Sequence, residues 1–172
     1  MEIIKPEKKY LDSYYQACKE TWGHVHDNYI IHNPEKYDEW KNTIFEEYEN
    51  KAKGINLPDG FVASETFWVV EGDEYIGTIN IRRSLSDNLR EYGGHAGLVI
   101  RYTRRKMGYG RKIVEMMLEK IHHMGVGEIL LTCEETNIGS QKILEKLKPV
   151  RVEKADVMLN NRLTPIKRYY FN

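Results

Sequence analysis

Residues 98–112, LVIRYTRRKMGYGRK, decide the fold of this chain. They begin as an apolar run typical of a strand and end at Gly108 and Gly110, where an amphipathic helical pattern starts. Glycine lets the main chain turn tightly, and the N–H groups at a helix start attract anions. The stretch therefore predicts a strand, a turn that binds a phosphorylated ligand, and a helix. Six basic residues accompany the turn: Arg101, Arg104, Arg105, Lys106, Arg111 and Lys112.

The turn does not match the common nucleotide-binding motifs. It lacks the G-x-x-x-x-G-K-[ST] pattern, and no third glycine completes a dinucleotide fingerprint. A solvated basic turn before an ordinary helix is the alternative interpretation. Because 26 Lys and Arg balance 26 Asp and Glu, no global charge favours nucleic acid or an anionic membrane as a partner.

Strand and helix patterns continue downstream of this stretch. The amphipathic helix is predicted over residues 108–124, and the apolar run 128–133 is typical of a strand covered on both faces. Asn137 is a plausible cap of a further helix. Residues 150–159 and 163–171 alternate in hydropathy around a turn, which predicts a closing hairpin.

The first half of the chain begins with a strand predicted over residues 2–5 and a helix over residues 8–22. Pro34 opens a second helical pattern, and the runs within residues 66–82 predict a hairpin. Residues 95–101 form the strand that enters the basic turn. This order of elements predicts a mixed α/β sheet.

Length and composition predict one domain over residues 1–172. Cys18 and Cys133 are too few for a disulfide framework, and the N-terminal residues lack the apolar core of a signal peptide. We therefore expect a cytoplasmic protein without a membrane span. No metal site is expected, because the only histidine cluster matches no standard ligand spacing. That cluster is His24, His26 and His32.

The turn and its surroundings resemble the GNAT superfamily of N-acetyltransferases. Residues 105–110 match the family pattern [QR]-x-x-G-x-[GA] between an apolar strand and a long helix, and ILLTCEETNIGSQKILEKL downstream also resembles the family. The resemblance implies a mixed, mostly antiparallel twisted sheet with helices on both faces. It also implies an acetyl-CoA-binding core over residues 93–147, an acceptor side over residues 1–92 and a closing hairpin over residues 148–172.

The resemblance implies particular coenzyme contacts. The pyrophosphate of acetyl-CoA would lie on main-chain amides of the turn, and the pantetheine arm would pair with the preceding strand. The Leu98 N–H would donate to the thioester oxygen. Asn137 would hold the arm or cap its helix, and Ser140 would face the coenzyme or be a small residue beneath it. The expected coenzyme-binding residues are Leu98, Ile100, Arg105, Lys106, Met107, Gly108, Tyr109, Gly110, Arg111, Asn137 and Ser140.

Two side chains are candidates for the base that accepts the proton of the amine. His95 opens the strand beside the expected thioester, and its unperturbed pKa suits proton transfer near neutrality. The alternative is a histidine bonded to the backbone at a strand entry. Glu134 ends the following strand and would act through water, unless it is a solvated loop carboxylate.

The implied activity is acetyl transfer from acetyl-CoA to a primary amine of a small molecule, peptide or protein, by direct attack in a ternary complex. Acetyl-CoA and an amine are the expected partners, and a homodimer is left open. Leu144 stands where many relatives have a tyrosine as acid for the thiolate, and Lys148-Pro149 replaces a glycine after the helix. The alternative is therefore a non-catalytic acyl-CoA-binding module or sensor.

Overall fold

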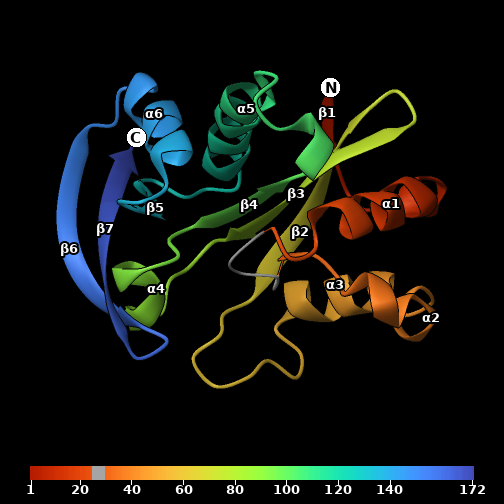
Figure 1. Cartoon of the computed structure of the whole chain (residues 1–172). Coiled ribbons are helices and arrows are strands. Elements are labelled where there is room, and N and C mark those ends of the chain that lie inside the picture. Colours follow the sequence, from red (N-terminus) through yellow and green to blue (C-terminus); the bar gives the residue numbers. More distant parts are fainter. Residues whose placement is uncertain (25–29) are drawn as a thin grey trace.

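The computed structural model describes residues 1–24 and 30–172 (Figure 1). His26 of the histidine cluster lies outside these residues. The strands form two antiparallel sheets, in the orders β1-β2-β3-β4 and β5-β7-β6. Helices cover both faces of the first sheet, which confirms the expected α/β class. The strands are β1 (Glu2–Ile4), β2 (Ser64–Glu71), β3 (Glu74–Arg82), β4 (Ala96–Ile100), β5 (Ile129–Glu134), β6 (Arg151–Leu159) and β7 (Arg162–Phe171).

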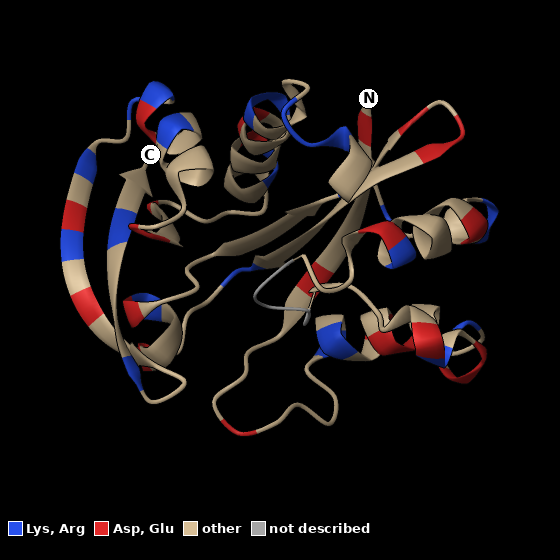
Figure 2. Cartoon of the chain, in the orientation of Figure 1, with Lys and Arg blue, Asp and Glu red and all other residues tan. Residues whose placement is uncertain are grey.

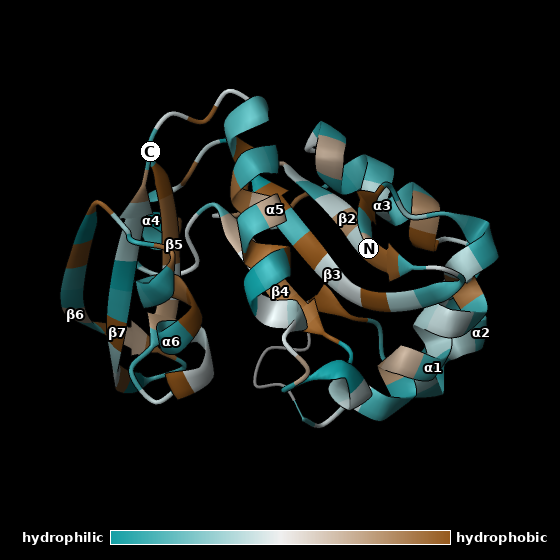
Figure 3. Cartoon of the chain, turned by 90° about the horizontal axis from the view of Figure 1, so that it is seen from above, coloured by the Kyte–Doolittle hydropathy of each residue, from teal (hydrophilic) through white to brown (hydrophobic). Residues whose placement is uncertain are grey.

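The two sheets meet at a single junction at the start of β4. His95 N donates to Leu130 O at 2.8 Å, and Leu130 N donates to His95 Nδ1 at 2.9 Å. Gly94 makes this contact close, because a Cβ added there would lie 2.3 Å from Leu130 O. Beyond the junction, β4 pairs with β3 alone in the described part of the chain, and the sheets diverge on either side of α5 (Figure 3).

The N-terminal helices are more broken than the sequence predicts. The helix expected over residues 8–22 is a 3-10 turn, Lys8–Tyr10, followed by α1 (Leu11–Thr21). Pro34 opens a 3-10 turn, Pro34–Lys36, and the single helix expected after it is divided into α2 (Tyr37–Trp40) and α3 (Ile44–Lys53). Trp40 and Ile44 on either side of this turn are both buried, at 6% and 0% exposure.

The helices and strands of the second half of the chain lie close to the positions predicted from the sequence. The helices α5 (Tyr109–His123) and α6 (Ile138–Lys146) begin and end within about one residue of the predicted positions. The hairpin of β6 and β7 closes on Asn160 and Asn161, whose φ angles of 49° and 61° match the two-residue turn that favours asparagine. For residues 84–94 the sequence left open a loop or a short helical turn, and the structure has a short helix there, α4 (Asp87–Glu91).

Two cores lie on opposite faces of the four-stranded sheet because side chains alternate along each strand. On β2, Phe67 and Val69 face α5, β5 and α6, whereas Trp68 and Val70 face α1, α2 and α3. Among the described residues, no helix is both long and apolar enough to cross a membrane. The sheet therefore separates the core beneath α5 and α6 from the core beneath the N-terminal helices.

Candidate active site

The turn between β4 and α5 leaves the start of the helix open. Gly108 precedes α5 with φ of +86°, a conformation that favours glycine, and no side chain caps the helix there. The first helical turn contains no acidic residue, and Figure 2 shows basic residues along the loop that enters it. Gly110 lies under α6, since a Cβ added to it would lie 2.8 Å from Ile143 Cδ1. This geometry suits an anion bound by main-chain amides.

Two of the six basic residues are held by carboxylates on other elements. Arg101 binds Glu20 of α1 with Nη2–Oε1 and Nε–Oε2 distances of 2.6 and 2.8 Å, and it also binds Glu74 of β3 at 2.9 Å. Arg104 binds the same Glu74 at 2.7 Å. The hydrogen bond from Arg101 lowers the pKa of Glu20. These ion pairs fasten the end of β4 to α1 and to the β2–β3 hairpin.

Arg105 also turns away from the solvent side of the turn. Its Nε donates to Ile100 O at 3.1 Å, so its side chain ties the turn to the strand before it. Burial lowers the pKa of Arg105. Lys106, with φ of 62°, and Met107 are exposed at the tip of the turn. The main chain at this tip is therefore accessible to a ligand.

Tyr109 and Arg111 continue the turn into α5. The Tyr109 hydroxyl donates to Glu71 Oε2 at 2.7 Å, which fixes the helix start to the end of β2. Arg111 pairs with Glu115 one turn along the helix, at 2.8 Å. Both side chains thus have protein partners, and the anion-binding capacity of this segment lies chiefly in its amides.

The outer edge of β4 presents main-chain groups at the two predicted positions. Arg101 N donates to Ile76 O at 2.8 Å, so the odd-numbered residues of this strand bond to β3. The N–H and C=O groups of Leu98 and Ile100 alternate with these and face away from β3. The bond from Arg105 to Ile100 O agrees with that direction. The edge is suited to pairing with an extended ligand.

His95 and Asn137 both have structural contacts. His95 Nδ1 accepts from the Leu130 N–H, the ring is buried at 8% exposure, and burial lowers its pKa. These contacts match the alternative of a histidine bonded to the backbone. Asn137 Oδ1 accepts from the Ser140 N–H at 3.0 Å, as an N-cap does, and its side chain is exposed.

Leu144 is buried in the core at 5% exposure, packed in the same cluster as Tyr169 of β7. Burial raises the pKa of Tyr169, whose hydroxyl donates to Glu145 Oε1 at 3.4 Å. The position of the usual family tyrosine is thus a packing position in this chain.

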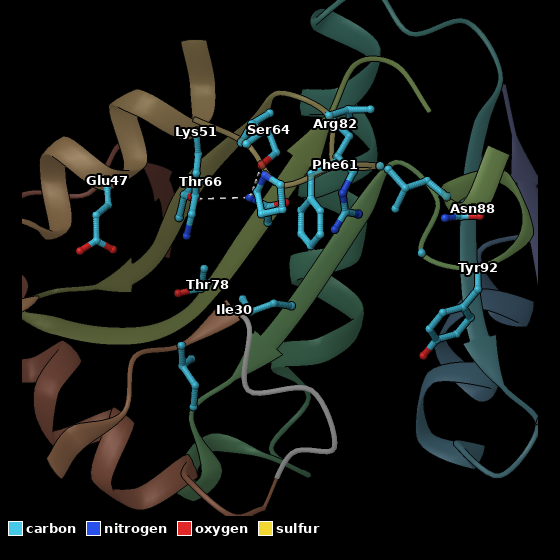
Figure 4. Close-up of a pocket in the computed structure, with 18 of the residues that line it drawn as sticks. Ile30, Glu47, Lys51, Phe61, Ser64, Thr66, Thr78, Arg82, Asn88 and Tyr92 are labelled. Carbon is cyan, nitrogen blue, oxygen red and sulfur yellow. Dashed lines mark hydrogen bonds between the residues drawn. The ribbon is translucent and has the colours of Figure 1, made fainter. Parts of the chain in front are cut away.

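A cavity of about 1220 Å³ lies on the other side of the β4–β5 junction (Figure 4). Its walls come from α2, α3, the loop 57–62, the ends of β2 and β3, α4, and the tip of the β6–β7 hairpin. Gly93, which precedes the junction, and Glu134, at the end of β5, belong to its lining, whereas the described lining includes no residue of the turn 105–111. The turn and the cavity are therefore distinct surfaces.

Glu134 is the one proton-transfer candidate that lines this cavity. Its Oε2 accepts from Thr136 Oγ1 at 3.2 Å, and its side chain is partly buried at the end of β5. His95 is not among the described lining residues. The structure therefore places Glu134 on the cavity lining and His95 as a link between the sheets.

The sequence analysis missed the floor of the cavity. Alternate residues of two paired strands form this floor, and Asn80 Nδ2 donates to Ser64 Oγ and Thr66 Oγ1 at 3.1 and 3.3 Å. The signal was the alternation T-I-N-I-R, in which polar residues share a face that an ordinary core would fill with apolar ones. The floor residues are Ser64, Thr66, Thr78, Asn80 and Arg82.

Among the described residues, no group of three or more His, Cys, Asp or Glu could hold a metal ion. The sequence matches a family model described as an acetyltransferase (GNAT) domain over residues 3–148. No curated protein sequence matches the chain significantly.

Several solved structures share the fold. A chimera of the spermidine N-acetyltransferase SpeG from Vibrio cholerae and hSSAT is 18% identical, with a TM-score of 0.63, and the match covers 99% of this chain and 95% of that one. RimL, a ribosomal alpha-N-protein acetyltransferase in complex with coenzyme A, is 11% identical, with a TM-score of 0.64 and coverages of 98% and 91%. A GNAT acetyltransferase from Bacillus anthracis is 15% identical, with a TM-score of 0.63 and coverages of 98% and 92%.

At these identities the structural likeness shows the fold alone. The family model extends over most of the sequence, from β1 to the end of α6, and includes the turn and the junction described above. The chain belongs to the GNAT family of acetyltransferases.

Proposed function

We propose that the protein transfers the acetyl group of acetyl-CoA to a primary amine by direct attack in a ternary complex. The observation that supports this most is the placement of two surfaces about one junction. An open helix start and the outer edge of β4 lie beyond it along the chain, and a cavity of about 1220 Å³ includes Gly93, just before it, in its lining. The GNAT family uses acetyl-CoA, and the structural neighbours are named for amine acceptors.

The residues present fit the coenzyme. The amides from Lys106 to Arg111 would bind its pyrophosphate, because no side chain caps α5 and Gly108 leaves open space beside them. The edge of β4 at Leu98 and Ile100 would pair with the pantetheine arm, and the Leu98 N–H would stabilise charge on the thioester oxygen. Asn137 and Ser140 cap α6 nearby. The coenzyme supplies a reactive thioester, and the chain supplies position.

The acceptor amine would approach through the cavity. Residues 1–92 supply most of the lining, and the hairpin tip supplies Leu159, Asn160, Arg162 and Thr164 as well. An amine is protonated near neutral pH and must lose a proton before it attacks. Glu134 is the carboxylate placed to accept that proton through water, because it lines the cavity beside the junction.

Coenzyme binding is the first test. Saturating acetyl-CoA should raise the free energy of unfolding by about 2 to 4 kcal/mol, measured by thermal shift. In Gly108→Glu this stabilisation should disappear, since a carboxylate and its bulk would occupy the phosphate site. Gly125→Glu is the matched control, because Gly125 follows the other end of α5 with φ of +85° and open space around it.

Equal coenzyme affinity in the two variants would remove the turn from the proposal. Release of the CoA thiol across a panel of primary amines then tests transfer. Binding without transfer to any amine would favour the alternative of a non-catalytic acyl-CoA-binding module, which the burial of Leu144 in the core keeps in view.

A further inference from the structure

A buried guanidinium lies on the floor of the acceptor cavity. Arg82 is only 8% exposed, yet it belongs to the cavity lining. Its backbone pairs with His95 next to the sheet junction, and its side chain extends into the pocket beside Phe61 (Figure 4). The sequence places it third in the alternation of polar residues that begins at Thr78. Arg82 is therefore a cation held at the inner end of the pocket.

No carboxylate of the described chain neutralises this cation. Arg82 forms no ion pair among the described residues, and its Nη1 donates to a neutral acceptor, Gly94 O, at 3.1 Å. Taking a charge out of water is costly unless an opposite charge or several hydrogen bonds compensate it. An anion that enters the cavity would supply the missing partner, and a bidentate carboxylate matches the guanidinium fork.

The neighbouring hydroxyl groups also suit an anion. Ser64 is the direct cross-strand partner of Arg82, so the two side chains lie on the same face of the sheet. Ser64 Oγ and Thr66 Oγ1 both accept from Asn80 Nδ2, which leaves their own O–H groups as donors. Two hydroxyl donors and a guanidinium therefore converge on one part of the floor.

The acidic residues of the cavity do not form a matching site for a polycation. Four acidic and four basic residues line it in the described part of the chain, so this lining is balanced in charge. Of the acidic ones, Glu47 Oε2 lies 3.3 Å from His32 Nε2, and Glu39 is paired with Lys36 at 3.3 Å. The basic four are Lys36, Lys51, Arg82 and Arg162, and the acidic four are Glu39, Glu47, Asp59 and Glu134.

We propose that Arg82 is a specificity-determining residue that binds a carboxylate of the acceptor, so that the substrates are amines that also carry a carboxylate, and not polyamines. The inference rests on the proposed function. Leu98 pairs with Ile79, and Arg82 follows three residues along β3. At about 3.4 Å per residue, the thioester and Arg82 positions lie about 10 Å apart along the strand. This axial separation, together with the lateral step of about 4.8 Å from β3 to β4, sets the scale of the span between the amine and the carboxylate of the substrate.

The test compares acceptors that differ only at the far end. One series of ω-amino acids, from 4-aminobutanoate to 8-aminooctanoate, measures the preferred span by release of the CoA thiol. At the preferred length, the carboxylate is compared with its isosteric carboxamide and with the corresponding diamine. We expect kcat/KM for the carboxylate to exceed that for the amide at least about tenfold, and that for the diamine by more.

Arg82→Gln should reduce the ratio of carboxylate to amide to near one, with an unchanged KM for acetyl-CoA. Arg83→Gln is the matched control, because Arg83 is exposed and paired with Glu65 at 2.8 Å; it should keep the ratio. If Arg82→Gln does not fold, Ser64→Ala leaves the guanidinium in place and should lower the ratio a few-fold.

Two results would overturn the proposal: a wild-type protein that prefers the diamine or the amide, or a folded Arg82→Gln that keeps the wild-type ratio. The absence of transfer to every amine would instead count against the proposed function. The two failures are thus distinguishable in one assay, because the ratio can be measured only if transfer occurs.

Discussion

The turn proposed for the coenzyme and the cavity proposed for the acceptor offer different kinds of binding group. The turn is seven consecutive residues, 105–111, and offers main-chain amides at a helix start that no side chain caps. The cavity is lined by side chains from α2, α3, β2, β3, α4 and the β6–β7 hairpin. Main-chain recognition tolerates many side chains as long as the glycines remain, whereas each wall residue of the cavity can change the acceptor. The first region therefore indicates the family, and under the proposed function the second would determine the acceptor.

The arginines of the two regions also differ in whether a carboxylate pairs with them. Arg101 and Arg104 beside the turn are held by Glu20 and Glu74, so their charge contributes to position more than to phosphate binding. Arg82 in the cavity has no such partner among the described residues. The number of basic residues in a segment is thus a poor measure of the charge that remains available to a ligand.

The largest effect that would separate the two regions is expected for Glu134→Gln. If Glu134 accepts the proton of the amine, kcat at neutral pH should fall about 100-fold, while the affinity for acetyl-CoA stays unchanged. The deficit should shrink as pH rises, because more of the amine is already deprotonated in solution. Steady-state kinetics over a range of pH, with calorimetry for the coenzyme, measure both.

Glu135→Gln is the control for that experiment, because Glu135 is the next residue and pairs with Lys154 at 3.0 Å without being among the described lining residues. An equal loss in both variants, or a loss that does not depend on pH, would exclude Glu134 as the base and leave the proton to water.

A smaller effect is expected for Glu20→Gln, which tests whether α1 supports the coenzyme turn. The variant removes the charge that Arg101 binds through two hydrogen bonds. Because hydrogen bonds between charged groups contribute about 1.5 to 3 kcal/mol, we expect the Kd for acetyl-CoA to rise roughly tenfold. Calorimetric titration measures it, with Asp12→Asn, an exposed carboxylate of the same helix, as control. A fall in stability without any change in Kd would limit the ion pair to holding the fold.

The smallest effect concerns the junction between the regions. Burial lowers the pKa of His95 from its usual 6.5, so the unfolded chain binds the proton more readily than the folded one. Its contribution to stability is full above pH 6.5 and is lost as pH falls through the lower, folded-state pKa. His95→Asn keeps an acceptor for the Leu130 N–H without titrating. It should change stability at pH 7.5 by less than about 1 kcal/mol and flatten the loss on the acid side.

Denaturant titrations at several pH values would show this change in slope. The loss of stability at acid pH should be smaller in His95→Asn but still present. Burial also lowers the pKa of His32, and the hydrogen bond with Glu47 offsets part of that shift. His122→Asn is the control, as His122 is exposed. An unchanged acid slope in His95→Asn would mean that the junction does not depend on a neutral imidazole.

The sequence predicted the second half of the molecule better than the first. The pattern of α5 and its stop at Gly125 are local properties, and the observed helix ends at His123. The N-terminal helices were predicted too long, because hydropathy spacing does not distinguish the 3-10 turn Lys8–Tyr10 from α1 or show the turn between α2 and α3. His95 was weighed as a base for the same reason, since its bond to Leu130 crosses 35 positions of the chain.

By itself the sequence determined the order of strands and helices, the glycine turn and the family, because these depend on residues that are neighbours along the chain. Tertiary structure alone decided that the sheets meet closely at Gly94, that Arg101 and Arg104 are neutralised, and that Arg82 is buried without a counter-charge among the described residues. Each of these depends on a contact, or on the lack of one, between residues far apart in sequence. Hydropathy and spacing do not show such contacts, because they describe one segment at a time.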